Sequence, residues 1–229
     1  MAVDLERVWE GVTARIWSRP QGPVERLARA VLRSPALARA LVTTPALLGS
    51  WLLATAVVLG VGVLVSRELG TPVVPLLAPA LTGAGIAYSY GPGTDPAYEL
   101  ARTLPVGPRM LLMVRALAVF AVNAVLGLAA TFAAPAADGI TVNWLLPMTA
   151  VAALCLAAAT LTGSPAAGVT IGLAGWAIAV LAAHGVTGRT DRAATSPVMA
   201  LPDLLFTAVC VGVTLYATRV PRSVAKGVV

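Results

Sequence analysis

The sequence predicts an all-α integral membrane protein with six transmembrane helices. Of its 229 residues, 58% are hydrophobic and 11% are charged, whereas an ordinary soluble domain carries roughly 25% charged residues. The mean hydropathy is +0.86. The apolar residues gather in six runs, each close to the roughly 20 residues that a helix needs to cross a bilayer core. These observations exclude a typical soluble domain.

The first 44 residues are predicted to form amphipathic helices at the cytoplasmic membrane surface, ahead of a transmembrane domain over residues 45–229. Apolar side chains recur at steps of three and four along one helix face: Leu5, Val8, Trp9, Val12 and Ile16. The stretch from Val24 to Leu41 follows the same pattern. We expect no signal peptide, because acidic residues are mixed with the arginines. A small cytosolic helical cap is the alternative to an interfacial helix.

The six apolar runs are predicted to be transmembrane helices. They extend from Ala46 to Ser66, Thr71 to Ser89, Met110 to Ala133, Asn143 to Thr162, Pro165 to His184 and Leu201 to Thr218. Only Gly163 and Ser164 separate the fourth run from the fifth. A single helix over both runs would be far longer than a bilayer is thick, so these two residues predict a tight helical hairpin.

The distribution of basic residues predicts that both termini are cytoplasmic, and we expect the protein in the inner (plasma) membrane. Loops on the cytoplasmic side are enriched in Lys and Arg. With the N-terminus inside, thirteen of the 16 basic residues lie inside, and only Arg67, Arg189 and Arg192 lie outside. The loop 90–109 is then cytoplasmic and the loop 185–200 external. This bias accounts for the net charge of +6, and no basic run interleaved with aromatic residues predicts nucleic-acid binding.

The cytoplasmic loop between the second and third predicted helices contains a short helix of its own. Asp95 followed by Pro96 is a strong helix start, and Pro105 ends the helix about two turns later. Tyr98, Glu99 and Arg102 lie within one turn and can face the same partner. Alternatively the helix lies on the lipid surface. Its mixed charge favours a protein partner, because a helix on an anionic leaflet is expected to be basic.

This arrangement resembles the permease subunits of type-2 ATP-binding-cassette exporters. The likeness of topology covers nearly the whole chain, whereas the likeness of residues is confined to the loop, where Glu99-Leu100, Leu104-Pro105-Val106 and Arg109 resemble the coupling-helix motif. The resemblance implies that the loop helix docks on a separate ATP-binding-cassette ATPase subunit, which binds ATP and Mg²⁺. The coupling residues it implies are Asp95, Tyr98, Glu99, Leu100 and Arg102. It also implies a second permease copy or a related permease. The external loop from Gly185 to Ala200 is short for this family.

A second resemblance competes with the first. The stretch from Tyr90 to Leu100 is similar to the membrane portions of actinobacterial anti-sigma factors with a zinc-binding head. Residues 1–44 contain no His or Cys, so we expect no zinc site of that kind. The alternative function is therefore a membrane-embedded regulatory or scaffold protein that binds a cytoplasmic signalling partner.

Other chemistry is weakly represented in the sequence. We expect neither catalysis nor a metal site, because there is no Walker A motif and His184 is the single histidine. Cys155 and Cys210 have no partner spacing. Asn123 is the only amide deep within a predicted span, which makes it a candidate for the substrate path or for an interhelical hydrogen bond. The lack of deeply buried charge favours a hydrophobic or amphiphilic cargo.

Overall fold

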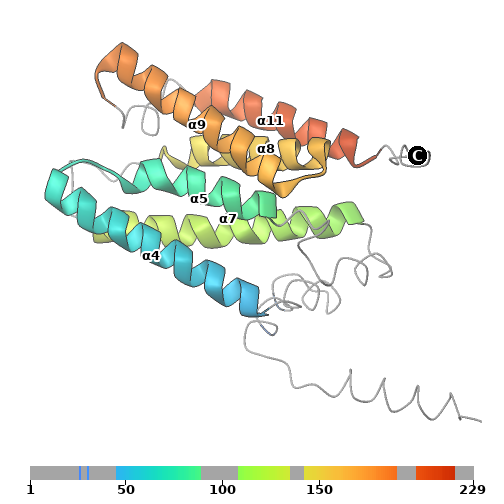
Figure 1. Ribbon diagram of the computed structural model, residues 1–229, viewed down its shortest axis with the longest axis horizontal. Coiled ribbons are helices and arrows are strands. Elements are labelled where there is room, and N and C mark those ends of the chain that lie inside the picture. Colours follow the sequence, from blue (N-terminus) through green and yellow to red (C-terminus); the bar gives the residue numbers. More distant parts are fainter. Residues whose placement is uncertain are drawn as a thin grey trace, which may run out of the picture. The chain divides into compact units, whose positions relative to one another are not determined.

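A computed structural model of the chain describes residues 26, 30, 45–88, 108–134, 142–189 and 200–219 (Figure 1). Contacts within the chain divide it into two units, Met1–Pro45 and Ala46–Val229. In the first unit, Arg26 and Ala30 are helical and exposed. The other predicted amphipathic positions, the predicted helix that begins at Asp95 and most of the external loop lie outside the described residues.

The described ranges contain six helices and no strand, which confirms the all-α prediction. The helices are α4 (Pro45–Leu69), α5 (Val74–Tyr88), α7 (Pro108–Ala133), α8 (Leu145–Thr162), α9 (Pro165–Thr187) and α11 (Ala200–Ala217). All except α5 are long and apolar enough to cross a membrane. These five helices mark the chain as a multi-pass membrane protein.

Helix α5 is shorter than the second predicted helix, Thr71 to Ser89. It has 15 residues, a length of about 22 Å, against a hydrocarbon core of about 30 Å. The first three predicted residues instead complete the turn from α4, where Gly70 has φ 64° and Ser66 Oγ accepts a hydrogen bond from Val73 N at 3.0 Å. The described part of α5 is therefore an apolar helix below transmembrane length.

The predicted hairpin between the fourth and fifth helices is confirmed. Helix α8 ends at Gly163, whose φ of 71° is readily adopted only by glycine, and its N–H donates to Ala159 O at 2.9 Å. Ser164 is extended, and its Oγ accepts a hydrogen bond from Ala167 N at 3.4 Å. Pro165 follows at the first helical position, where no N–H is needed. The chain thus reverses within two residues.

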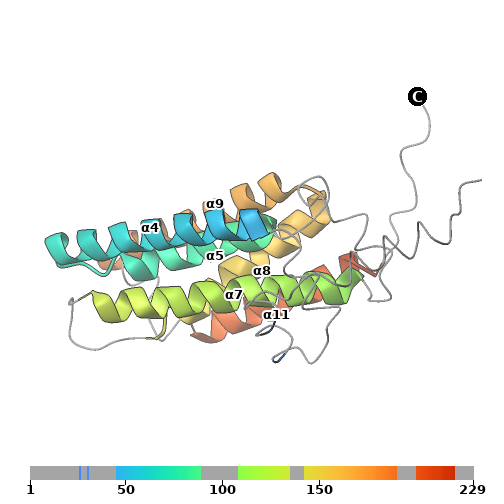
Figure 2. The same ribbon diagram turned by 90° about the horizontal axis from the view of Figure 1, so that it is seen from below.

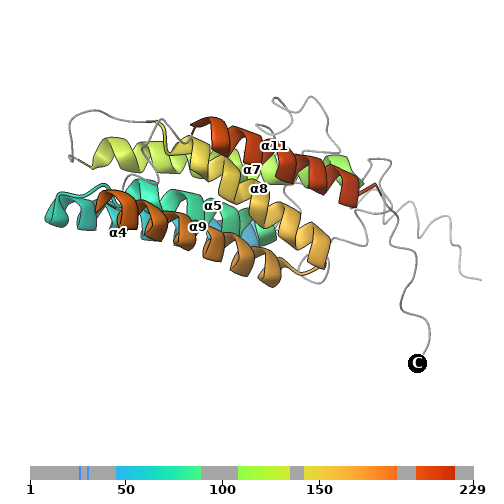
Figure 3. The ribbon, with the colours of Figure 1, turned by 90° about the horizontal axis from the view of Figure 1, so that it is seen from above.

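Successive helices of the second unit run in alternating directions (Figure 1). We call one end of this bundle the proximal end; α4 and α7 begin there, and α5 and α11 end there. The opposite end is called the distal end. Figures 2 and 3 show two layers, with α4, α5 and α9 in one and α7, α8 and α11 in the other. Helix α8 runs obliquely towards the first layer, where it joins α9.

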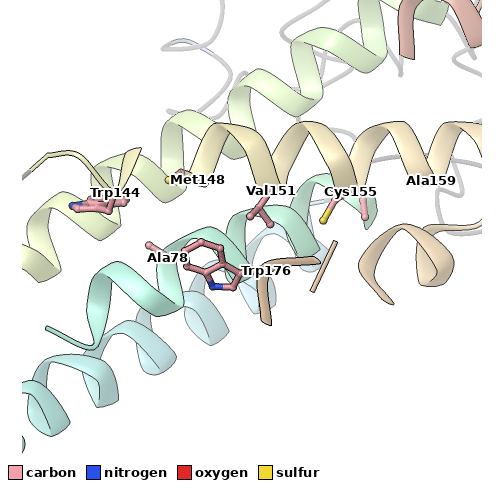
Figure 4. Packing of buried hydrophobic residues seen from close by; sticks show 8 residues of the cluster. Ala78, Trp144, Met148, Val151, Cys155, Ala159 and Trp176 are labelled. Carbon is pink, nitrogen blue, oxygen red and sulfur yellow. The ribbon is translucent and has the colours of Figure 1, made fainter. Parts of the chain in front are cut away.

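Helix α8 is the centre of the bundle. In its membrane-length window 67% of the residues are buried, compared with 11% to 22% in the other four long helices, and it contacts α5, α9 and α11. One side of α8 and the turn before it faces Ala78 of α5 and Trp176 of α9 (Figure 4). The residues along that side are Trp144, Met148, Val151, Cys155 and Ala159. Trp176 Nε1 also donates to Leu76 O at 2.9 Å, which joins α9 to α5.

Three helices approach one another most closely around the Cys155 sulfur. Gly83 of α5 and Gly172 of α9 both face it: a Cβ added at Gly83 would lie 2.7 Å from Cys155 Sγ, and one added at Gly172 would overlap it. We call Gly83, Cys155 and Gly172 the glycine junction. Both cysteines of the chain are free thiols, so the sulfur acts here as a packing group.

Candidate functional site

The five predicted coupling residues, Asp95, Tyr98, Glu99, Leu100 and Arg102, lie outside the described residues. The helix ends on either side of them are described. Helix α5 ends at Tyr88, which is 57% exposed, and α7 begins at Pro108. Both ends lie at the proximal end of the bundle, so residues 89–107 connect two helices there (Figure 1).

Asn123, the candidate for the substrate path, lies near the middle of the apolar span Leu112–Ala133 in α7. It is only 2% exposed. Its Nδ2 donates to Val119 O at 2.9 Å, but its Oδ1 has no donor within the part of the chain that the structure describes. An unpaired buried polar atom is costly, more so where the bilayer keeps water away.

Asn123 belongs to a line of α7 residues that packs against α5. Val119, Asn123 and Gly127 are four residues apart and therefore share one helix face. A Cβ on Gly85 of α5 would lie 3.1 Å from Val119 Cγ1, and one on Gly127 would lie 3.5 Å from Ala78 Cβ. Since the helices are antiparallel, Asn123 lies between these two contacts. We call this face of α7 (Val119, Asn123 and Gly127) and the residues packed along it, Ala78, Thr82 and Gly85 of α5 and Trp144, the α7 seam.

Two buried threonines lie at about the level of Asn123. Thr82, on α5 between Ala78 and Gly85, is 0% exposed, and its hydroxyl donates to Ala78 O at 2.8 Å. Thr55 of α4 is 3% exposed. It lies one turn after Trp51, whose Nε1 would be 3.0 Å from a Cβ on Gly85. The α7 seam is therefore apolar with a few uncharged polar groups at one depth.

Trp144, which precedes α8, covers the distal part of the α7 seam. Its ring lies directly on Gly127, where an added Cβ would meet Cη2 at 2.7 Å. Trp144 is 0% exposed, and its Nε1 finds no acceptor among the described residues. The ring nitrogen lies on the side turned away from Met148 (Figure 4). The sequence predicted Trp144 only as part of the fourth span.

Other buried hydroxyls in the bundle bond to the backbone of their own helix. Ser66 Oγ donates to Gly62 O at 2.7 Å, Thr160 to Ala157 O at 2.8 Å and Thr214 to Cys210 O at 2.9 Å. This local bonding satisfies a polar side chain without any partner helix. Within the described ranges, the two buried side-chain atoms left unpaired are Asn123 Oδ1 and Trp144 Nε1. Both lie on the α7 seam.

The charged groups of the described residues lie towards the ends of the helices. At the distal end, Arg67 Nη2 of α4 donates to Ala133 O at 2.8 Å, placing a cation at the C-terminus of α7. Arg115 is half-buried on the same face of α7 as the seam, two turns towards the proximal end from Asn123. The described residues include no group of three or more His, Cys, Asp or Glu side chains suited to a metal ion.

Comparison of the chain with protein-family models, with curated proteins and with solved structures found no match. The resemblance to type-2 exporters therefore stays a prediction from the sequence. What the molecule does has to be inferred from the helix arrangement and from the chemistry of the α7 seam.

Proposed function

We propose that this chain is the membrane-spanning subunit of an ATP-driven exporter for a hydrophobic or amphiphilic substrate. It crosses the plasma membrane six times, with α5 as one of the crossings and both termini in the cytoplasm. A separate ATP-binding-cassette subunit hydrolyses ATP, and a second permease copy or a related permease completes the transporter. This proposal rests on the place where residues 89–107 join the bundle. They connect α5 to α7 at the proximal end, where α4 also begins and α11 also ends.

Helices α5 and α7 are suited to transmit a movement from that end. Helix α5 contacts α7, α8 and α9, so a push on the segment after Tyr88 acts on a helix that lies against three others. The glycine junction leaves little space for α5 to deform locally. A rigid-body displacement of α5 and α7 is therefore the expected response to closure of a partner ATPase.

The residues of the α7 seam favour an amphiphilic cargo over an inorganic ion. Asn123 and Thr82 are buried, polar but uncharged, and their neighbours on the seam are apolar. Transport of ions through membrane helices generally uses ionisable groups at membrane depth. A seam of this composition is better matched to a molecule that is mostly apolar and carries a few hydrogen-bonding groups.

The test is purification of the tagged full-length protein from its native membranes, followed by mass spectrometry and an ATPase assay. We expect a stoichiometric ATPase subunit, whose binding weakens about tenfold or more in Glu99→Arg, because reversing a charge at a docking surface costs more than about 1.4 kcal/mol. The matched control is Glu68→Arg, the same change in an exposed residue near the distal end of α4.

The control variant should retain the ATPase subunit at the wild-type level. A complex that contains a signalling protein and no nucleotide-binding subunit would instead support a membrane-embedded regulator. If the ATPase subunit is present but Glu99→Arg leaves both binding and transport unchanged, the exporter assignment stands and the predicted coupling role of Glu99 is wrong.

A further inference from the structure

The α7 seam has unmet hydrogen-bonding capacity of both kinds. Asn123 Oδ1 is an acceptor and Trp144 Nε1 is a donor, and neither has a partner in the described ranges. The bulk of the seam between them consists of Gly127 and Ala78, which have almost no side chain. Gly127, which the Cη2 edge of the Trp144 ring covers, lies one helical turn, or roughly 6 Å, from Asn123 along α7.

We propose that the α7 seam binds a neutral amphiphile whose head group carries both hydrogen-bond donors and acceptors, such as hydroxyl or amide groups. A donor of the head group pairs with Asn123 Oδ1, and an acceptor pairs with Trp144 Nε1. The inference rests on the proposed function in one respect: it takes the bound molecule to be the exported substrate. Binding itself requires only the chain described here.

The chemistry of the seam selects against charged head groups. Thr82 and Asn123 are uncharged, and an ion taken from water into such surroundings loses hydration that these groups do not replace. The nearest charged residue on this face of α7 is Arg115, about 12 Å from Asn123 along the helix. A purely apolar chain would fit the surface but would leave both polar atoms unpaired.

Loading of the seam requires helix α4 to move. Asn123 and Trp144 are 2% and 0% exposed, so the seam is closed in this structure. On the α4 side it is bounded by Trp51 over Gly85 towards the proximal end and by the Arg67 hydrogen bond to Ala133 O at the distal end. Parting of α4 from its neighbours between these two attachments, which also opens the contact of Gly62 with Leu77 of α5, gives an amphiphile access to Asn123 from the lipid.

The experiment compares three photoreactive, alkyne-tagged probes that share one acyl chain and differ in the head group. A glycerol monoester supplies donors and acceptors, a methyl ester supplies acceptors alone, and the free carboxylate is charged. The full-length protein is placed in phosphatidylcholine vesicles, since this lipid has no hydrogen-bond donor of its own. After irradiation, labelled peptides are mapped by mass spectrometry.

We expect the glycerol ester to label α4, α5 and α7 peptides at the seam about fivefold more than either other probe, as one additional hydrogen bond predicts. Asn123→Leu, which keeps a similar side-chain size, should lower this labelling to the methyl-ester level. Thr170→Val, a lipid-exposed change on α9, should leave it unchanged. Trp144→Phe removes the donor while retaining an aromatic ring and should reduce labelling two- to fivefold.

Equal labelling by the three probes, preferential labelling by the carboxylate, or unchanged labelling in a folded Asn123→Leu protein would each overturn the proposal. If Asn123→Leu does not fold, the Trp144→Phe variant decides: reduced labelling supports the proposal, and unchanged labelling overturns it. The assay contains neither ATP nor an ATPase subunit, so its outcome is independent of the exporter test. An ATPase complex without seam labelling would refute this site alone, whereas seam labelling without an ATPase partner would refute the exporter alone.

Discussion

The glycine junction and the contact of helix α11 with α8 differ in how closely the side chains and backbones are packed. At the junction, α5, α8 and α9 approach until a single methyl group added to Gly83 or Gly172 would collide with Cys155. Helix α11 buries only Cys210 and Thr214 below the surface, and its Thr207 hydroxyl lies 3.3 Å from that of Thr149 on α8. Where lipid surrounds a bundle, helices associate through close packing and a few hydrogen bonds rather than through the hydrophobic effect. The junction should therefore be the most rigid part. Helix α11 lies along α8 as extensively as α5 and α9 do, but it has open space at Gly212 and should be the more adjustable part.

Helix α4 is intermediate between these extremes. Leu59 and Thr55 are buried, and a Cβ on Gly62 would lie 3.0 Å from Leu77 Cδ1 of α5. Two hydrogen bonds also tie the distal end of α4 to neighbouring elements. Ser66 bonds to Val73 N and Arg67 to Ala133 O. Access to the α7 seam therefore requires the buried contacts of Leu59 and Thr55 to open while the Arg67 hydrogen bond keeps the distal end attached.

The largest expected effect is that of Gly172→Ala at the glycine junction. The new methyl group would overlap Cys155 Sγ, so α8 and α9 must move apart. Overpacking of this kind costs about 1 to 3 kcal/mol and occasionally more, and we expect the upper end because the neighbouring atom lies beside a helix backbone. The measurement is the free energy of unfolding in mixed micelles of a mild detergent and dodecyl sulfate.

A second substitution shows whether the sulfur is responsible. Cys155→Ala removes Sγ and leaves the Cys155 Cβ 3.3 Å from the new methyl carbon of residue 172. The double variant should therefore recover more than half of the lost stability, a coupling that a double-mutant cycle detects. Additive losses would mean that the junction is not the tight contact described here.

Most of the helical framework could be predicted from the sequence, because apolar length and turn residues are local signals. The hairpin at Gly163 and Ser164 is an example, since a glycine C-cap and a serine N-cap act within their own turns. The short α5 could not be predicted in this way. Its start depends on Ser66, in the preceding helix, accepting the Val73 N–H, and hydropathy does not register that contact.

Ser66→Ala is expected to have the next largest effect, at the link between α4 and α5. The Ser66 side chain is 1% exposed, and its loss leaves the Val73 N–H without its acceptor. Because this donor is only part-buried, we expect a loss near the lower end of the range of about 1 to 3 kcal/mol for an unsatisfied buried donor. The same unfolding assay measures this cost, and Ser66→Thr, which restores a hydroxyl, should recover part of it. A loss below the precision of the assay would show that the turn is not held by this bond.

The candidate site was only partly predictable, because part of it depends on a contact between separate segments of the chain. Asn123 is conspicuous as an amide in an apolar run, so its sequence position alone suggested a role. Trp144 was not distinguished from other residues at the start of a span, because its unpaired nitrogen follows from the packing of its ring on Gly127. The available signal was the spacing of four residues between Asn123 and Gly127. Trp144, which packs on that glycine, lies on a different segment of the chain.

The smallest effect, and the only one in the opposite direction, is predicted for Gly212→Ala in α11. A Cβ at Gly212 would meet nothing within 4 Å, so the change removes backbone entropy without a collision and should stabilise the protein by up to about 1 kcal/mol. The same substitution thus has opposite signs at Gly172 and at Gly212. If both variants lose stability to a similar degree, α11 is packed against another surface, and the contrast between a rigid junction and an adjustable outer helix has to be abandoned.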